Sequence, residues 1–445
     1  MDISVHPPRV RTLLSRLFTS GLRAVNPAKA ILRHVSRSRS ILQIGEKRYD
    51  LRAHDRIMVV GAGKASAVMA RALEKIVGSR LTGGLVAVKY GHAVPTRRIE
   101  VVEAGHPVPD RSGCRVAARI LDLVSGLGSR DLLLVLISGG ASSLLVSPSG
   151  GVTLADKQRT TQLLLRSGAS IQEMNTVRKH LSAVKGGRLA AATKARVACL
   201  ALSDVVGDDL GSIGSGPTAP DPTTYRGARR ILQQYHLWSR VPSRVRTHVL
   251  NGVRGSTPET PTSSSGVFRR VQNLIIGNNT AAVEAVAKAA RRAGFQPLIL
   301  STTLTGEART AATLFGTMAR EILAFGRPLR RPACLVAGGE LTVTVRGKGR
   351  GGRVQEFALA AALEIDGLDN VWLGGFGTDG TDGPTGVAGA MANGSTIGRA
   401  KQRGLDPLRA LARNDSYGFF RKVGGHITTG PTGTNVGDLY LLLVL

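Results

Sequence analysis

The chain of 445 residues is poor in several features that would assign a protein to a class. It has three cysteines, Cys114, Cys199 and Cys334, which are scattered and lack the spacing of a metal site. An odd number of scattered cysteines is typical of reduced thiols and argues against a disulfide framework. No run approaches the roughly 18 uncharged apolar residues that a membrane span needs. These absences favour a cytoplasmic globular protein without a membrane partner.

Acidic and aromatic residues are also scarce. Asp and Glu number 30 against 60 Lys and Arg, which gives a formal net charge of +30, and aromatics make up only 4%. Such a charge is typical of proteins that bind nucleic acid. However, the aromatics do not interleave with the basic runs, so the stacking platforms for single strands are missing. The cations are mostly arginines spread along the chain, which favours charged helix surfaces and anionic substrates over a specific nucleic-acid partner.

The N-terminal segment has two interpretations. Residues 1–43 contain one acid and eight cations, as a transit peptide does. However, apolar residues recur at helical spacing up to Asn26-Pro27, namely Leu13, Leu14, Leu17, Phe18, Leu22 and Val25. We favour an amphipathic helix that packs on a domain, followed by a short helix over 28–34.

The length exceeds what one hydrophobic core supports, so about two or three domains are expected. Short apolar strands alternate with helices, which predicts βαβ units and mostly parallel sheets. The pattern also predicts a long helix over 177–194 and a strand over 341–345. Residues 255–266 are rich in Gly, Pro, Ser and Thr, as a linker is. We therefore predict two α/β domains, a Rossmann-like domain over 1–254 and a second over 267–445.

Glycine-rich loops follow the apolar strands, where ligands bind in open α/β sheets. The first is Gly61-Ala62-Gly63-Lys64, in which backbone N–H groups and a lysine suit phosphate oxygens. It is neither a Walker loop nor a full dinucleotide fingerprint, because its glycine-to-lysine spacing is short and Lys89-Tyr90 offers no acid for ribose. The later loops lie at 138–143, 203–209, 214–218, 338–340, 347–353, 378–384 and 429–435. So many are hard to explain as turns alone.

Acids and histidines supply further candidates. A carboxylate at Asp204, after an apolar strand, suits Mg²⁺ or the orientation of a substrate hydroxyl, whereas a capping role fits Asp209 better. The segment 378–384 resembles a hard-cation loop without full EF-hand spacing. His106 and His180 could each contact a carboxylate, and for each a structural role is equally compatible with the sequence.

Taken in order, these loops resemble those of the glycerate 2-kinase family, whose C-terminal half is called the MOFRL domain. The similarity extends to 105–110, 175–182 and 185–188, and so covers nearly the whole chain. It implies an ATP-dependent kinase that phosphorylates D-glycerate at the 2-hydroxyl, giving 2-phosphoglycerate and ADP, with Mg²⁺ and an active site in the interdomain cleft. The implied partners are these small molecules, and a homodimer is compatible with the resemblance.

The resemblance also implies roles for individual residues. Lys64 would contact the transferring phosphate or glycerate, Asp204 would orient the hydroxyl or act as base, and Arg353 would stabilise charge. Asp379 and Asp382 would be candidates for Mg²⁺. The residues expected at nucleotide, phosphate or substrate are Gly61, Gly63, Ser138, Gly139, Gly140, Ser142, Ser215, Gly216, Glu340, Gly351, Gly352, Thr432 and Asn435. Two positions depart from the family pattern: Val354 replaces an asparagine, and Ala141 replaces a glycine.

A second function stays open, namely an NAD(P)H-dependent hydroxypyruvate reductase, an activity often attached to relatives of this family. It requires a nicotinamide site, which the missing ribose acid and the many phosphate-type loops argue against. The kinase is therefore the preferred hypothesis.

Overall fold

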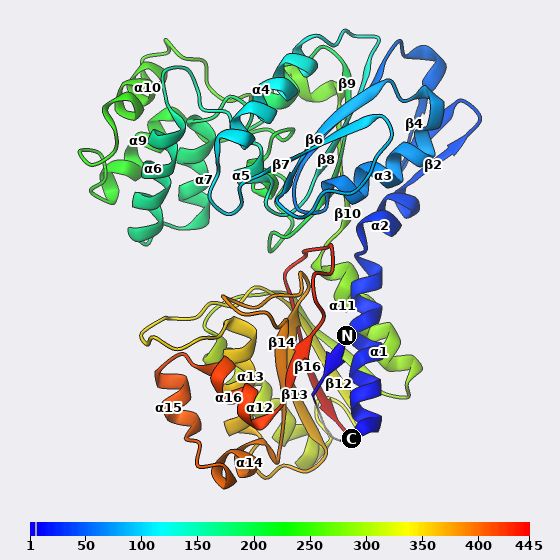
Figure 1. The fold of residues 1–445 in the computed structure, drawn as a ribbon, viewed down its shortest axis with the longest axis vertical. Helices are drawn as coiled ribbons and strands as arrows, with labels where there is room; N and C mark the ends of the chain where they lie inside the picture. Colours follow the sequence, from blue (N-terminus) through cyan, green and yellow to red (C-terminus); the bar gives the residue numbers. More distant parts are fainter. Residues whose placement is uncertain (5–6) are drawn as a thin grey trace. The chain divides into compact units, whose positions relative to one another are not determined.

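The computed structural model describes residues 1–4 and 7–445, which divide into two compact units. Unit 1 combines residues 1–26 with 277–445, and unit 2 spans 27–276. Each unit has its own sheet and hydrophobic core (Figure 1). The prediction of two α/β domains is confirmed, but the units have different bounds. The first 26 residues belong with the C-terminal half, and the expected linker 255–266 lies inside unit 2.

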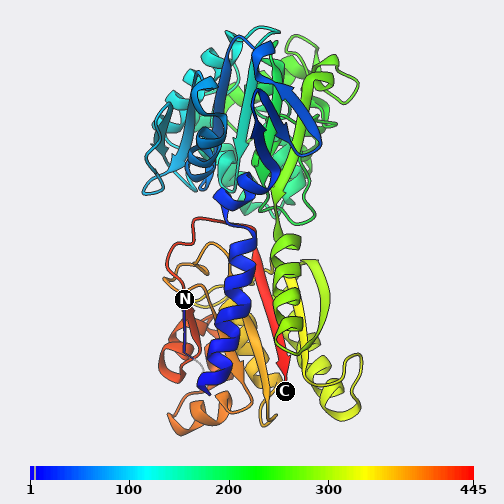
Figure 2. The same ribbon diagram turned by 90° about the vertical axis from the view of Figure 1, so that its right-hand side faces the viewer.

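The apolar stripe of the first helix explains this division. Helix α1 (Pro8–Ala24) forms as predicted, buries Leu14, Leu17 and Phe18, and runs alongside α11 (Asn279–Arg292) of unit 1 (Figure 2). The Phe18 ring meets the ring of Phe376 edge-on, with centroids 4.6 Å apart. The short helix α2 (Pro27–His34) packs instead on α3 (Ser66–Val77) of unit 2.

The main sheet of unit 2 is built from apolar strands in the order β10-β9-β8-β5-β6-β7. Its strands are β5 (Ile57–Ala62), β6 (Gly83–Lys89), β7 (Ile99–Ala104), β8 (Leu132–Ile137), β9 (Arg196–Leu202) and β10 (Val271–Gly277). Every pair from β9 to β7 is parallel, as predicted. All six residues of β8 are buried, which matches its uninterrupted apolar sequence. A parallel sheet brings the carboxyl ends of these strands to one edge.

Helices and a small antiparallel sheet complete unit 2. The helices are α3, α4 (Arg111–Ser125), α5 (Ala141–Leu144), α6 (Leu154–Arg166), α7 (Ile171–His180), α8 (Arg188–Ala191), α9 (Tyr225–Gln234) and α10 (Ser243–Val253). The small sheet comprises β2 (Val35–Ser38), β3 (Ile41–Ile44) and β4 (Lys47–Asp50). The expected helix over 177–194 was wrong. Helix α7 already ends at His180, and Gly186 and Gly187, directly before α8, have φ of 56° and 77°, a left-handed conformation through which a helix cannot continue.

The sheet of unit 1 is mostly antiparallel, in contrast to the expected parallel one. Its order is β1-β15-β14-β13-β16-β12-β11, and β11 with β12 is the parallel pair. The strands are β1 (Asp2–Ile3), β11 (Gln296–Leu304), β12 (Ala333–Gly339), β13 (Val371–Gly377), β14 (Gly389–Asn393), β15 (His426–Thr428) and β16 (Asp438–Val444). The C-terminal strand β16 causes the difference, because it lies between β12 and β13 and runs against both.

Helices of unit 1 pack around this sheet, in particular α12 and α13 on its core (Figure 1). Besides α1 and α11 they are α12 (Ala308–Phe325), α13 (Arg353–Glu364), α14 (Thr396–Gln402), α15 (Pro407–Ala412) and α16 (Ser416–Val423). The expected strand over 341–345 does not form, since only Thr342 makes an isolated bridge, to Glu307.

Two further expectations concern the cysteines and the membrane. All three cysteines are free thiols, and burial raises the pKa of Cys199 to about 11 and that of Cys334 to about 12. Within residues 1–4 and 7–445, no helix has both the length and the apolar character to cross a bilayer.

Candidate active site

Lys64 follows the carboxyl end of β5, which is an interior strand of the unit 2 sheet. The loop after β5 is tied to the loop after the neighbouring strand β8. Lys64 N donates to Gly139 O at 2.9 Å, and Ser138 Oγ accepts from Ala65 N at 3.0 Å. Lys64 is half-buried. Two of the predicted phosphate loops therefore meet at one lysine, at the sheet edge where α/β proteins bind ligands.

The glycines beside Lys64 are required by close contacts. Gly63 has φ of 140°, and a Cβ there would lie 2.1 Å from Ser138 Oγ. Gly140 has φ of 88°, and a Cβ there would lie 2.8 Å from the ring of His106 and 3.5 Å from Lys64 Cγ. A side chain is excluded at both positions. His106 and Lys64 therefore approach each other over Gly140, which places that histidine in the candidate site.

The serines predicted to bind phosphate or substrate also lie together. Ser142 Oγ and Ser215 Oγ are 2.8 Å apart, although the two serines are 73 residues apart in the chain. Arg178 Nη2 donates to Ser142 Oγ at 2.6 Å, and Lys185 Nζ donates to the same oxygen at 3.0 Å. Ser215 has φ of 63°, an uncommon conformation for a serine. Its neighbour Gly216 has φ of 61° and holds the loop through its carbonyl, which accepts from Gly187 N at 2.7 Å.

Sequence reasoning gave no role to Arg178 and Lys185. Both lie within the expected helix over 177–194, where charged residues suggest a solvated face. The signal that could have found them is their place in segments 175–182 and 185–188, which follow the family pattern. The glycine break between α7 and α8 places Lys185 outside a helix and buries it.

The remaining unit 2 candidates separate into two groups. Asp204 is half-buried and lies two residues beyond β9, at the same sheet edge as Lys64. Asp209 is a turn residue, since its carboxylate accepts from Gly211 N at 3.1 Å and from Ser212 Oγ at 2.6 Å. His180 is buried, with Nδ1 2.8 Å from Thr176 O and Nε2 3.1 Å from a Glu259 oxygen. These contacts assign His180 a structural role.

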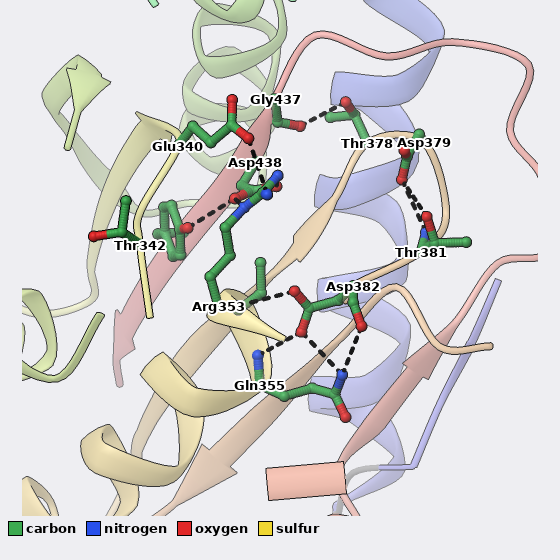
Figure 3. Close-up of polar contacts among 12 residues, drawn as sticks. Glu340, Thr342, Arg353, Gln355, Thr378, Asp379, Thr381, Asp382, Gly437 and Asp438 are labelled. Atoms are coloured by element: carbon green, nitrogen blue, oxygen red, sulfur yellow. Dashed lines mark hydrogen bonds and ion pairs between the residues drawn. The ribbon is translucent and has the colours of Figure 1, made fainter. Parts of the chain in front are cut away.

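In unit 1, Arg353 begins α13 and is held by two carboxylates (Figure 3). Its Nε lies 2.5 Å from Asp438 Oδ2, its Nη2 3.0 Å from Asp438 Oδ1, and its Nη1 2.9 Å from Glu340 Oε1. Tyr440 OH donates to Asp438 Oδ2 at 2.9 Å. Asp438 is 1% exposed. Burial disfavours the charged guanidinium, but the contacts with Asp438 and Glu340 outweigh it and raise the pKa of Arg353.

Asp438 and Tyr440 were missed because they open an apolar C-terminal strand, where no pattern marks chemistry. Burial raises the pKa of the Asp438 carboxyl, and its contact with Arg353 opposes that rise. The buried Asp438 carboxylate fixes Arg353 at the carboxyl end of β12. Arg353 lies there beside Glu340, which directly follows that strand.

Asp382, expected to bind Mg²⁺, has its carboxylate occupied by hydrogen bonds to the start of α13. Its carboxylate is 3% exposed and accepts from Val354 N at 3.1 Å, Gln355 N at 2.8 Å and Gln355 Nε2 at 2.9 Å (Figure 3). Burial, with a smaller contribution from Asp438, raises its pKa to about 6. Asp382 therefore caps the first turn of α13. Asp379 Oδ1 accepts from Thr381 N and Oγ1 at 3.0 and 2.9 Å. In the described part of the chain, no three His, Cys, Asp or Glu side chains gather to hold a metal ion.

Several expected binding glycines and polar residues are explained by packing. A Cβ at Gly352 would lie 2.2 Å from Asp382 Oδ1, and one at Gly351 would lie 2.1 Å from Ser416 Oγ. Gly61 allows backbone approach, since a Cβ there would lie 2.4 Å from Leu136 O. In the C-terminal loop, Thr432 Oγ1 donates to Thr378 O at 2.5 Å, and Asn435 Oδ1 accepts from Gly437 N at 3.3 Å.

Both departures from the family pattern fit their surroundings. Val354 is 0% exposed and packs in the unit 1 core, and its backbone N–H donates to Asp382 Oδ1. Ala141 is 2% exposed at the first position of α5, and it is not among the non-glycine residues with positive φ. A glycine is therefore not required at position 141.

Comparisons with known proteins agree with this arrangement of loops. Residues 13–250 match a family model described as a domain of unknown function (DUF4147), and residues 333–438 match the MOFRL family. A glycerate 2-kinase of Pyrococcus horikoshii is 42% identical over 98% of this chain and 97% of its own. The chain belongs to the glycerate 2-kinase family. A crystal structure of glycerate kinase from Thermotoga maritima superposes with a TM-score of 0.86 and 40% identity, covering 99% of this chain and 100% of that one.

Relatives within the family carry two names. A protein of Agrobacterium vitis that is 45% identical over 87% of this chain and 99% of its own is named a putative hydroxypyruvate reductase. The kinase and reductase names therefore both occur at similar identity, and the chemistry of the site has to separate them.

Proposed function

We propose that this protein transfers the γ-phosphoryl group of ATP to the 2-hydroxyl of D-glycerate, giving 2-phosphoglycerate and ADP. The observation that carries the proposal is the placement of Lys64 at the junction of the β5 and β8 loops, in a chain that is 42% identical to a glycerate 2-kinase over almost its full length. Phosphoryl transfer depends on positioning and on cations near the phosphate oxygens, which these loops supply.

The proposed step forms one bond and breaks one. The 2-hydroxyl oxygen of glycerate attacks the γ-phosphorus, and the bond from that phosphorus to the oxygen bridging it to the β-phosphate breaks, so that ADP leaves. Lys64 neutralises charge on the transferring phosphoryl group. Asp204, which follows β9 at the same edge of the sheet, accepts the hydroxyl proton or its hydrogen bond.

Arg353 has a proposed role in neutralising phosphate charge. Because Asp438 and Glu340 both contact it, the three side chains together carry one net negative charge when ionised. An incoming phosphate oxygen competes with the exposed partner, Glu340, rather than with the buried Asp438. We propose that Glu340 leaves Arg353 for a substrate hydroxyl when the nucleotide binds, while Asp438 keeps the guanidinium in place.

The described residues are suited to a Mg²⁺ ion that binds together with the nucleotide. They are less suited to an ion whose ligands all come from the protein. Mg²⁺ in kinases is commonly bound by one or two carboxylates together with substrate phosphates and water. Asp382 is committed to α13, so Asp379 is the remaining carboxylate of the expected pair. The ion would supply charge neutralisation for the phosphates, and Asp379 would be a carboxylate that could hold it.

Hydroxypyruvate reduction is the second candidate function, since two relatives are named putative hydroxypyruvate reductases. A dinucleotide site of the Rossmann type places an acid after the second strand of the βαβ unit to bind ribose. Here β6 ends at Lys89 and continues to Tyr90, which favours the kinase.

A coupled ADP-release assay across small 2-hydroxy acids tests the proposal, with the product identified by ³¹P NMR as the 2- or 3-phosphate. We expect D-glycerate to give ADP and 2-phosphoglycerate in equal amounts. Oxidation of NADH by hydroxypyruvate without any ADP release from glycerate would replace the kinase with the reductase.

A further inference from the structure

The cations Arg178 and Lys185 of unit 2 have no acidic partner among the described residues. Lys185 is 2% exposed, and Arg178 is half-buried. Arg178 donates to Ser142 Oγ at 2.6 Å and to Asn175 Oδ1 at 3.4 Å, while Lys185 donates to Ser142 O and Oγ at 2.8 and 3.0 Å. All these acceptors are neutral. Among the described residues, no carboxylate forms an ion pair with either side chain.

Uncompensated burial of two like charges is costly, because buried charges are normally paired. The cost appears in the pKa values: burial lowers the pKa of both groups, and Arg178 and Lys157 lower that of Lys185 further. Lys157 is itself buried and donates to the carbonyl oxygens of Arg178 and Leu181. By contrast, the neighbouring Lys179 is paired with the buried carboxylate of Asp221 at 3.2 Å. The fold therefore pairs one lysine and leaves the adjacent cations without an anion.

The position of this cluster identifies the ligand. Ser142 lies two residues after Gly140, the glycine against which Lys64 and His106 pack. Two trans peptides place their Cα atoms at most about 7.6 Å apart, so side chains around Gly140 and Ser142 can contact opposite ends of one small molecule. A group bound at Ser142 and Arg178 therefore belongs to the same small molecule as a hydroxyl near Lys64.

We propose that Arg178 and Ser142, backed by Lys185, bind the carboxylate of the 2-hydroxy-acid substrate. Arg178 and Ser142 are the half-buried members and reach the ligand, whereas Lys185, Ser215 and Asn175 are buried behind them. The guanidinium holds the carboxylate through charge-assisted hydrogen bonds, which discriminate an acid from a polyol. Lys185 is a positioning residue that fixes the Ser142 backbone. This assignment rests on the proposed function, since it names the part of the glycerate molecule bound at that site.

The test compares Arg178→Gln with Arg178→Lys and Ser142→Ala, and uses Arg166→Gln, which removes an exposed arginine, as the matched control. With D-glycerate varied at saturating ATP, we expect Arg178→Gln to raise KM on the order of 10- to 100-fold, as loss of a hydrogen bond to a charged group does. Arg178→Lys should recover part of the loss, and Ser142→Ala should raise KM by several-fold. KM for ATP should stay within about two-fold of wild type in each variant, because none of these substitutions removes a group that binds the nucleotide.

A substrate lacking the carboxylate gives an independent readout. Wild type should prefer D-glycerate over glycerol strongly in kcat/KM, and Arg178→Gln should reduce that preference by the same factor by which it raises KM for glycerate. A rise in KM for ATP with no change for glycerate would assign the cluster to a nucleotide phosphate and overturn the proposal. A lower melting temperature with both KM values unchanged would make the cations purely structural and would also overturn it.

Titration calorimetry separates failure of the site from failure of the proposed function. D-glycerate is titrated into the full chain without ATP, so that binding is measured apart from turnover. Binding to wild type that is lost in Arg178→Gln and kept in Arg166→Gln supports the carboxylate site even if the transferred group is not phosphate. Equal binding to wild type and both variants overturns the site even where ADP release proceeds. Ser142→Ala, which removes one hydroxyl, provides the same comparison if Arg178→Gln does not fold.

Discussion

The two carboxylates that hold Arg353 provide a test of how burial sets the strength of an ion pair. Asp438 is 1% exposed and binds the guanidinium through two oxygens, whereas the Glu340 side chain is 46% exposed, with Oε1 2.9 Å from Arg353 Nη1. Removing one partner of a buried ion pair costs about 3–5 kcal/mol, and the lower end applies here because Arg353 is 34% exposed and keeps its contact with Glu340. An exposed pair contributes about 0–1 kcal/mol. We therefore expect Asp438→Asn to lower the stability of unit 1 by about 3 kcal/mol, and Glu340→Gln by less than about 1 kcal/mol.

Tyr440→Phe gives an intermediate point in the same series. It removes the hydroxyl that donates to Asp438 Oδ2 at 2.9 Å and keeps the ring. A hydrogen bond to a charged group contributes about 1.5–3 kcal/mol. The expected order of destabilisation is therefore Asp438→Asn, then Tyr440→Phe, then Glu340→Gln.

The positions of the two tryptophans suit this measurement. Trp372 lies in β13 of unit 1, where it pairs in register with Leu443 of β16, and Trp238 lies in unit 2. Urea unfolding is followed by fluorescence in a Trp238→Phe background, so that the signal reports on unit 1, and free energies come from linear extrapolation. Equal destabilisation by Asp438→Asn and Glu340→Gln would refute the argument that burial makes Asp438 the anchor of Arg353.

Three further predictions follow from the site. Lys64→Ala should lower kcat on the order of 100-fold or more in the ADP-release assay, as loss of a charge at the phosphoryl group does, and near-normal turnover would contradict its role. Because the pKa of Asp382 is raised to about 6 in the fold, stability should fall as pH rises from about 4 to 6, by on the order of 3 kcal/mol; in Asp382→Asn that part of the slope in urea unfolding should vanish. Gly352→Ala should lower the melting temperature, because its Cβ would lie 2.2 Å from Asp382 Oδ1, whereas Gly386→Ala meets nothing within 4 Å and should not. Equal melting temperatures would refute the packing role of Gly352.

The unit 2 site was largely predictable because its parts are local in the sequence. An apolar strand followed by glycine marks a strand end, and parallel strands bring such ends to one edge, so the loops at Lys64, Ser138 and Asp204 could be placed together. The charged pair of Arg178 and Lys185 could not be placed, because periodicity extended a helix through Gly186 and Gly187. In the structure Arg178 lies in the last turn of α7, whereas Lys185 lies in the non-helical segment between α7 and α8.

The unit 1 site was less predictable because its decisive contacts are long-range. Arg353 and Asp438 are 85 residues apart and meet because the C-terminal strand inserts between β12 and β13. Alternating strands and helices give no signal for that insertion, and a parallel order was expected in its place. The contacts of Asp382 were hard to predict for a related reason, since a cation-binding loop and a helix cap both use aspartate among glycines.

The glycine-rich loops of the two units differ in what their charges can bind, although they look alike in sequence. In unit 1 the glycines at 351 and 352 admit neighbouring side chains, and the arginine they precede already has two carboxylates. In unit 2 the glycines at 63 and 140 leave room for a serine and a histidine around a lysine. Arg178 and Lys185 nearby find only neutral acceptors among the residues that the structure describes. A small anion therefore gains most by binding at unit 2, where it supplies the missing counter-charge. At unit 1 an anion must first displace Glu340, so that binding there depends on a ligand with enough charge to compete, as a nucleotide polyphosphate has.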